Sequence, residues 1–247
     1  MRRASIGVLA NLAPDERWSS IAPLLGDPLR AVRIDAASAL AESSAAAANP
    51  AWQRAAQEFE ATQRYLADRP EARVTLGTFY ARQRRFADAE AQFRSAIALE
   101  PSFVPAYVNL ADCFRVQQRD ADAAQVLRQG LAQAPESAPL HHVLGLALVR
   151  LKQGDESTRL LQRATQLAPD DARFAYVYAV ALNSARQNAP AIAELERALA
   201  RHPEDRDLLL ASIAFRRDSG DQAGAARYAQ RFAERYPDEA RSREAAK

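Results

Sequence analysis

The side chains best suited to catalysis or metal binding are few in this 247-residue sequence: one cysteine, Cys113, and three histidines, His141, His142 and His202. Adjacent residues point to different sides of a helix, so His141 and His142 cannot hold one metal ion together. Cys113 has no histidine near it in the sequence, which favours a small half-buried thiol over a nucleophile. A single cysteine also excludes an internal disulfide and a cysteine-based metal site or haem-attachment motif.

Motifs that mark common active sites are missing as well. The sequence has no glycine-rich phosphate loop, no Gly-x-Ser-x-Gly and no His-Glu-x-x-His. Acidic pairs such as Asp170-Asp171 and Glu204-Asp205 fall where helices are expected to begin, and the helix dipole favours carboxylates there. We therefore expect a protein that is not an enzyme and that has no cofactor and no metal site.

The charge balance and hydropathy narrow the classes of partner. The 33 basic residues nearly cancel the 31 acidic ones, so we expect no nucleic-acid binding. No run of about 18 apolar residues occurs, so we expect no membrane span. The first ten residues resemble the start of a signal peptide, but Asn11 and Pro14 interrupt the apolar stretch. We expect a cytoplasmic chain as written, or a periplasmic one if it is a fragment of an exported parent.

The elements that would position any site recur along the chain. Prolines follow one another at intervals of 34 residues, at Pro101, Pro135, Pro169, Pro203 and Pro237. Repeats that start at Pro70, Val104, Ala138, Ala172 and Arg206 place small and large residues in register. In the first repeat these residues are Leu76-Gly77, Tyr80, Ala89, Phe93 and Ala96. Small residues let two helices approach closely, and large residues fill the space around that contact.

This pattern resembles the tetratricopeptide repeat (TPR) family over residues 70–239. The resemblance implies two antiparallel helices per repeat and stacking of the repeats, because one repeat cannot bury its apolar face alone. The expected fold is an all-α, right-handed α-solenoid with a TPR array of about five repeats over residues 70–247. Ser212 and Arg216 occupy normally apolar places in the fifth repeat, so we expect a degenerate terminal repeat with a polar outer face.

The first 69 residues differ from this pattern. Residues 27–41 resemble the second helix of a short HEAT-type repeat, with residues 17–25 as its partner helix and a helix near residues 2–12 as an incomplete copy. We expect a truncated HEAT-like segment over residues 1–48, with Ile6, Leu9 or Leu12 poorly covered and with self-association through that first helix. Asn49 and Pro50 then begin a helix over residues 51–68, which resembles a lone second TPR helix and caps the array over residues 49–69.

The TPR resemblance also implies a binding groove, lined by the first helix of each repeat. The groove positions include polar or charged residues, Asn109, Asn183, Arg82, Arg115 and Arg150, and an apolar strip that includes Val143, Leu146 and Tyr176. Amides can bond to an extended peptide backbone, and arginines can pair with carboxylates. His141 is expected to pack against the partner helix and His142 to face the groove. The clamp of chaperone-binding members is not expected, because only Asn109 of its five places is kept.

Two functions remain open from the sequence. The leading one is a protein-interaction scaffold that binds a peptide segment or a partner protein in the groove. The alternative is a non-catalytic C-terminal fragment of a larger exported multihaem redox protein, because the chain resembles the C-terminal part of bacterial proteins in which HEAT-like repeats run into TPRs.

Overall fold

The computed structural model describes the backbone of residues 2–245 and the side chains of residues 2–241. Every regular element in this range is a helix, and no strand occurs among the described residues. The chain divides into two compact units, residues 1–122 (unit 1) and 123–247 (unit 2), and the boundary falls in the first turn of α8 (Asp120–Gln133). No helix among the described residues is both long and apolar enough to cross a membrane.

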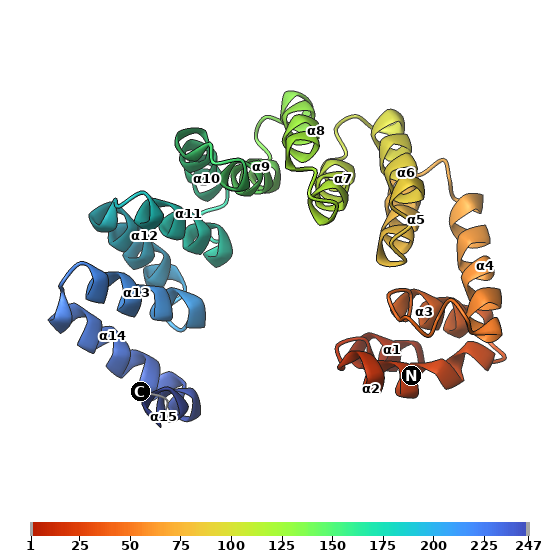
Figure 1. Cartoon of the computed structure of the whole chain (residues 1–247), viewed down its shortest axis with the longest axis horizontal. Coiled ribbons are helices and arrows are strands. Elements are labelled where there is room, and N and C mark those ends of the chain that lie inside the picture. Colours follow the sequence, from red (N-terminus) through yellow and green to blue (C-terminus); the bar gives the residue numbers. More distant parts are fainter. Residues whose placement is uncertain (1, 246–247) are drawn as a thin grey trace. The chain divides into compact units, whose positions relative to one another are not determined.

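Unit 1 begins with short helices and continues with longer ones that are packed in chain order (Figure 1). Its elements before α8 are α1 (Arg2–Leu9), α2 (Pro14–Ile21), the 3-10 helix η1 (Ala22–Gly26), α3 (Arg30–Ala39), α4 (Pro50–Tyr65), α5 (Pro70–Arg82), α6 (Phe86–Leu99) and α7 (Val104–Val116). The expected cap of α4 is confirmed, because Asn49 Oδ1 accepts a hydrogen bond of 2.9 Å from the Trp52 backbone N–H.

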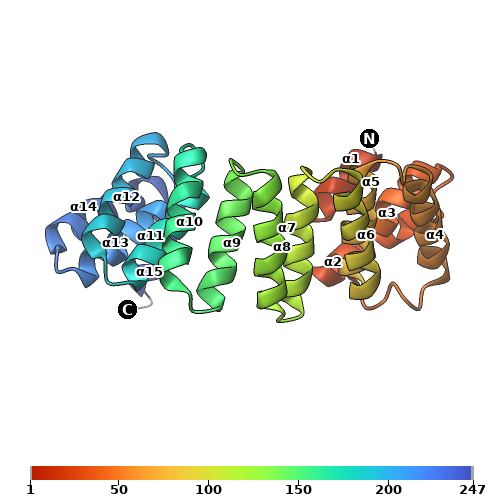
Figure 2. The ribbon, with the colours of Figure 1, turned by 90° about the horizontal axis from the view of Figure 1, so that it is seen from above.

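Unit 2 consists of helix pairs in which successive helices lie side by side (Figures 1 and 2). Its elements after α8 are α9 (Ala138–Arg150), α10 (Gly154–Leu167), α11 (Ala172–Ser184), α12 (Asn188–Arg201), α13 (Arg206–Asp218), α14 (Gln222–Arg235) and α15 (Pro237–Ala245). The first helices of the repeats start 34 residues apart from Pro70 to Arg206, and so do the second helices from Phe86 to Gln222. The five expected repeats are therefore present as helices.

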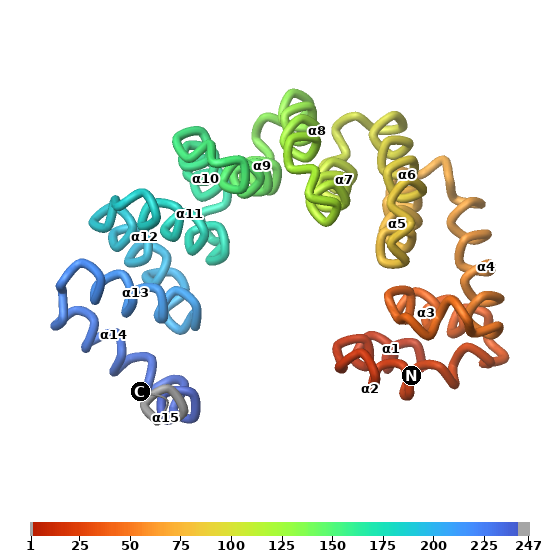
Figure 3. Tube along the Cα trace, viewed as in Figure 1, coloured from red at the N-terminus to blue at the C-terminus, as the bar shows by residue number. Residues whose placement is uncertain are grey.

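The turn inside each helix pair has one backbone conformation, and Figure 3 shows the chain reversing there. Four non-glycine residues, Arg84, Gln118, Lys152 and Arg186, have φ near +60°, and Gly220 has φ +85° at the equivalent place. This left-handed conformation lets the next N–H return to the end of the first helix, as in the 2.9 Å bond from Gln187 N to Leu182 O. The same turn therefore forms with and without glycine.

In two of the helix pairs, a glycine on the first helix lies in close contact with a large side chain of the second helix. A Cβ atom added to Gly77 would lie 2.6 Å from Cε1 of Phe93, and one added to Gly145 would lie 2.7 Å from Cγ of Leu161. Ser157 strengthens the second contact, since its hydroxyl donates a 2.9 Å hydrogen bond to the Gly145 carbonyl. These contacts explain why the repeat pattern pairs small residues with large ones.

The N-terminal segment differs in detail from the sequence expectation. The helix expected over residues 17–25 begins earlier, at Pro14, and changes to the 3-10 form at Ala22. The change falls next to Pro23, which has no backbone N–H and so cannot make the hydrogen bond that would continue the α-helix. Ile6 was expected to be poorly covered, but it is only 4% exposed, and α1 packs on α2 and α3. Leu9 and Leu12 are partly exposed.

The expectation that Ser212 and Arg216 give the fifth repeat a polar outer face is wrong. Ser212 and Arg216 are buried, at 2% and 6% exposure, and do not lie on an outer surface. Arg216 pairs with Glu196 and with Asp221, and its guanidinium lies 4.9 Å from the centre of the Tyr228 ring. Burial is possible because these carboxylates offset the charge, although Nε of Arg216 has no hydrogen-bond partner among the described residues. The helices α14 and α15 continue the packing beyond α13.

Candidate functional site

A pocket of about 230 Å³ opens in unit 1 where α5 and α7, the first helices of two neighbouring repeats, pack together. Its lining residues come from α5, α6 and α7: Thr78, Ala81, Arg82, Phe86, Phe93, Asn109, Asp112, Cys113 and Val116. Two residues that the sequence marked for partner binding, Arg82 and Asn109, therefore lie at one pocket.

The buried part of this pocket is apolar. Phe93 is 1% exposed and Cys113 is 3% exposed. The Cys113 sulfur lies 3.6 Å from Nε2 of Gln117 and 4.0 Å from the Phe86 carbonyl oxygen. Burial, together with the nearby Glu90 carboxylate, raises the pKa of the Cys113 thiol to about 11. The thiol is therefore protonated at neutral pH and serves as an apolar surface, not as a nucleophile.

The accessible part of the pocket carries hydrogen-bonding groups. The Asn109 amide donates 2.8 Å to the Pro105 carbonyl of its own helix and accepts a long 3.4 Å bond from the Thr78 hydroxyl. An amide nitrogen has two hydrogens, so these bonds leave Asn109 a second donor for a ligand. Arg82 is exposed and donates only a 3.5 Å bond to the Ser38 carbonyl, and it forms no ion pair with any described residue.

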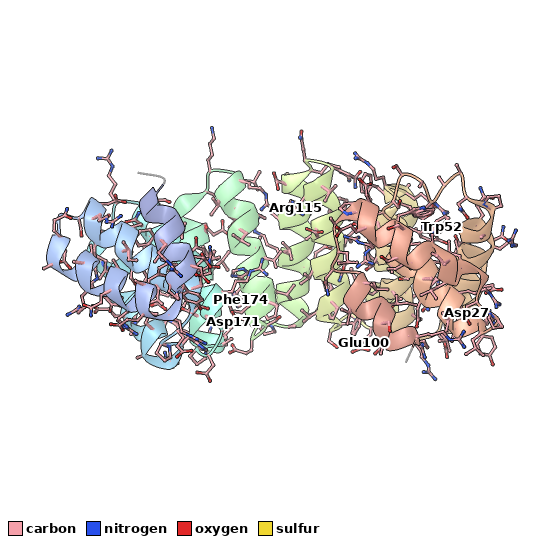
Figure 4. All side chains as sticks on the ribbon, turned by 90° about the horizontal axis from the view of Figure 1, so that it is seen from below. Asp27, Trp52, Glu100, Arg115, Asp171 and Phe174 are labelled. Carbon is pink, nitrogen blue, oxygen red and sulfur yellow. The ribbon has the colours of Figure 1, made fainter. Side chains whose placement is uncertain are left out.

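Arg115 differs from Arg82, although both were expected to attract a partner's carboxylates. Its guanidinium lies 2.7 Å from Oδ1 of Asp112, one turn earlier on α7 (Arg115 is labelled in Figure 4). Both side chains are about half exposed or more. The Asp112 carboxylate offsets the charge of Arg115, so Arg82 is the stronger candidate for a new ion pair.

The first helices of unit 2 offer a more apolar surface. Val143 and Leu146 on α9 and Tyr176 on α11 are partly exposed, and Tyr176 packs against the buried core. Arg150 is exposed at the end of α9. Asn183 is partly exposed, but its Oδ1 atom is buried and has no hydrogen-bond partner among the described residues.

His142 was expected to face the groove, but its side chain is buried. It is 4% exposed, and its ring stacks on Phe174 of α11 (Phe174 is labelled in Figure 4) with the ring centres 4.3 Å apart. Neither ring nitrogen has a hydrogen-bond partner among the described residues, and burial together with the charge of Arg173 lowers the pKa of His142 to about 4. His141, which was expected to pack, is partly exposed, and its Nε2 lies 2.9 Å from the Pro135 carbonyl.

The chemistry-bearing residues do not assemble into a reactive centre among the described residues. No group of three or more His, Cys, Asp or Glu side chains there could hold a metal ion. Asp171 and Asp205 cap helices, as expected, and accept bonds from the backbone N–H groups of Phe174 and Leu208. The Cys113 position was missed as part of a site, because sequence reasoning treated it as simple packing.

The fold and these first-helix faces define a class, the all-helical repeat proteins built from stacked helix pairs. Three tetratricopeptide-repeat family models match residues 74–138, 117–181 and 208–239. The chain therefore contains tetratricopeptide repeats, as its sequence pattern indicated. None of the curated proteins matches the sequence.

Solved structures of TPR type share this fold at low identity. A crystal structure of MamA is 18% identical, with a TM-score of 0.59 over 70% of this chain and 94% of that chain. YrrB, described as a TPR protein with an unusual peptide-binding site, is 18% identical, with a TM-score of 0.55 over 69% and 88%. PilF of Pseudomonas aeruginosa is 19% identical, with a TM-score of 0.59 over 88% and 99%. These identities support the fold alone.

Proposed function

We propose that this protein is an interaction scaffold that binds an extended segment of a partner protein on the first-helix faces of its TPRs. The observation that carries the proposal is the pocket between α5 and α7, where an apolar interior lies beside the Asn109 amide and the unpaired Arg82 guanidinium. Apolar pockets with a few polar groups beside them are the usual form of a binding site.

The chemistry of the faces defines the kind of segment. In unit 1, Asn109 would bond to the peptide backbone, and Arg82 would pair with a carboxylate. In unit 2, the apolar contacts would come from Val143, Leu146 and Tyr176. Weaker polar contacts would come from Asn183 and Arg150 in unit 2 and from Arg115 in unit 1. The partner segment is therefore mixed apolar and acidic. The peptide-binding site named for YrrB makes such a role plausible for a chain of the same fold.

The test begins with a random peptide display selection against the purified full chain, followed by affinity measurements on the selected peptides. Tyr176→Ala is expected to weaken binding of a peptide that contacts unit 2 by about 2 kcal/mol, because partly buried aromatic residues are typical hot spots. Asn109→Ala is expected to weaken the binding of a peptide that contacts unit 1 by about 1 kcal/mol, which is the net contribution of one hydrogen bond.

The matched control is Gln125→Ala on the second helix α8, where the side chain is exposed. Arg82→Ala should act mainly on the association rate and its salt dependence. Equal losses in the control and in the first-helix variants would contradict the proposed face. Normal binding by both first-helix variants, with helical content intact, would place the peptide elsewhere.

We also propose that residues 1–48 are a HEAT-like segment that precedes the array. The support is the packing of α3 against α1 and η1, which joins the two expected helical copies. Val8 is 72% exposed on α1, which suits self-association through that helix. Analytical ultracentrifugation of the full chain and of Val8→Glu tests this, since a concentration-dependent dimer of the wild-type chain should be lost in the variant. The multihaem-fragment alternative stays a prediction.

A further inference from the structure

Two neighbouring repeat junctions in unit 1 are built from equivalent residues. At the first junction, three rings from α4 and α5 pack together: the centre of the Phe79 ring lies 4.3 Å from that of Phe59 and 6.0 Å from that of Trp52 (Trp52 is labelled in Figure 4). Phe79 is 2% exposed, so its ring closes this junction. The chain thus fills the space between a second helix and the next first helix with its own side chain.

At the next junction the same three positions do not fill the space. Adding 34 to Trp52, Phe59 and Phe79 gives Phe86, Phe93 and Cys113. All three line the pocket between α5 and α7. The two aromatic positions on the second helix are kept, but the ring on the first helix is replaced by a thiol. The pocket therefore lies where the preceding junction holds the ring of Phe79.

The size of the pocket fits this interpretation. It measures about 230 Å³, whereas an apolar cavity of about 150 Å³ is large enough to bind benzene. The Cys113 thiol is protonated and neutral at physiological pH, so an aromatic ring beside it meets no buried charge. Val116, 48% exposed, adds an accessible apolar side chain to the lining.

The positive charge of Arg82 beside the pocket favours a partner in which an acidic residue stands next to the aromatic residue. Arg82 lines the pocket and has no ion pair among the described residues, whereas Asp112 is already paired with Arg115. A carboxylate next to the ring in the partner would therefore find a guanidinium without an ion pair among the described residues, and little competing negative charge.

We propose that this pocket binds the aromatic side chain of a phenylalanine-type residue in an extended partner segment, with an acidic residue next to it. The partner's ring occupies the position equivalent to the ring of Phe79, against Phe86 and Phe93, and the neighbouring carboxylate pairs with Arg82. This inference rests on the proposed function and specifies the anchor that unit 1 selects.

Fluorescence polarisation with defined peptides tests it on the full chain. The probe is a short labelled peptide with one phenylalanine flanked by aspartates, and matched probes replace the phenylalanine by alanine or the aspartates by lysines. The wild-type chain should bind the first probe at least about tenfold more tightly than the alanine probe, the gain expected from burying one ring. Arg82→Glu should lower the affinity for the aspartate probe several-fold and should raise the affinity for the lysine probe.

The decisive variant is Cys113→Phe, which supplies from the chain itself the ring that the pocket lacks. It should keep the wild-type helical content, because phenylalanine already packs at the equivalent Phe79, and it should lose about tenfold or more in affinity for the phenylalanine probe. Gln125→Phe places the same ring at an exposed position on α8, outside the pocket, and should bind as the wild type does.

A second measurement does not depend on the folding of any variant. Saturating phenylalanine probe should slow hydrogen–deuterium exchange of the backbone of α5 and α7 around the pocket in the wild-type chain, and the alanine probe should not. Equal affinity for the two probes, or equal protection by them, overturns the aromatic anchor. The proposed function is judged separately, by whether any display-selected peptide responds to Asn109→Ala or Tyr176→Ala.

Discussion

A buried glutamate in unit 1 and a buried histidine in unit 2 show how differently the two units treat polar groups. Glu90 is 8% exposed, and its carboxylate accepts hydrogen bonds from Gln117 at 3.1 Å, Arg119 at 2.9 Å and Arg94 at 3.0 Å. His142 is 4% exposed, and neither of its ring nitrogens has a hydrogen-bond partner in the part of the chain that the structure describes. Burying a polar group without a hydrogen bond costs about 1–3 kcal/mol.

The contrast extends beyond these two residues. Among the described side chains, every buried nitrogen or oxygen without a partner belongs to unit 2, in His141, His142, Asn183, His202, Ser212 and Arg216. Helix pairs of one repeat type therefore stack with very different degrees of polar satisfaction. The comparison predicts that substitution of a hydrogen-bonded buried group, such as Glu90, and of an unbonded one, such as Ser212, will change stability with opposite sign.

The largest expected effect is acid destabilisation of unit 2 through His142. The folded-state pKa of about 4 lies below the ordinary histidine value of 6.5, so the unfolded chain takes up the proton first as the pH falls. Stability should fall between pH 6.5 and 4, by about 2 kcal/mol at pH 4.5 and up to about 3 kcal/mol in full. Urea unfolding of the wild-type chain and of His142→Leu measures this loss.

Unit 1 serves as the internal control for this effect, because all three histidines lie in unit 2. Hydrogen exchange should show that opening of α9 and α11 becomes easier over this pH range before that of α5 and α6. The histidine account would be contradicted if His142→Leu lost as much stability between pH 6.5 and 4.5 as the wild type.

The next effect compares a satisfied and an unsatisfied buried group directly. Glu90→Ala should destabilise the chain by about 2 kcal/mol, because it removes three hydrogen bonds to a charged group and leaves partly exposed arginines that water can solvate. Ser212→Ala should stabilise by about 1 kcal/mol, because it removes a buried hydroxyl that bonds to nothing. Glu71→Ala, at an exposed site on α5, is the control for the first variant. Destabilisation of similar size by Glu90→Ala and Ser212→Ala would show that the contrast has no energetic meaning.

The smallest effect concerns a feature that the units share, the left-handed turn residues. Arg84→Gly in unit 1 and Arg186→Gly in unit 2 should each stabilise by up to about 1 kcal/mol, because glycine adopts φ near +60° without strain. Gly220→Ala should destabilise by about the same amount. Thermal unfolding of the three variants is sufficient, and a destabilising Arg186→Gly beside a stabilising Arg84→Gly would show that the turns are not equivalent.

The repeat architecture could be predicted from the sequence because its determinants are local. The prolines, the small residue at the close contact and the large residues around it recur at one spacing, and the helices begin at that spacing. The burial of Arg216 could not be predicted in this way, because its partner Glu196 lies on another repeat. A polar residue at an apolar place was therefore wrongly interpreted as an exposed one.

The candidate site was predicted only in part, for the same physical reason. First-helix positions follow from the period, so Arg82 and Asn109 could be named beforehand. The pairing of Arg115 with Asp112 and the burial of His142 under Phe174 depend on side-chain conformations that a repeat pattern does not specify. The pocket was not predicted because it arises where Cys113 is too small to fill the space that Phe79 fills one repeat earlier. Detecting it requires a comparison of equivalent positions in adjacent repeats.

The central claim, that the first-helix faces hold a partner segment, is tested most directly by hydrogen–deuterium exchange of the full chain with and without a display-selected peptide. The account predicts added protection in the first helices that contact the peptide, α5 and α7 or α9 and α11, and little change in the exposed faces of the second helices α6, α10 and α12. Protection confined to those second helices, with the first helices unchanged, would contradict it.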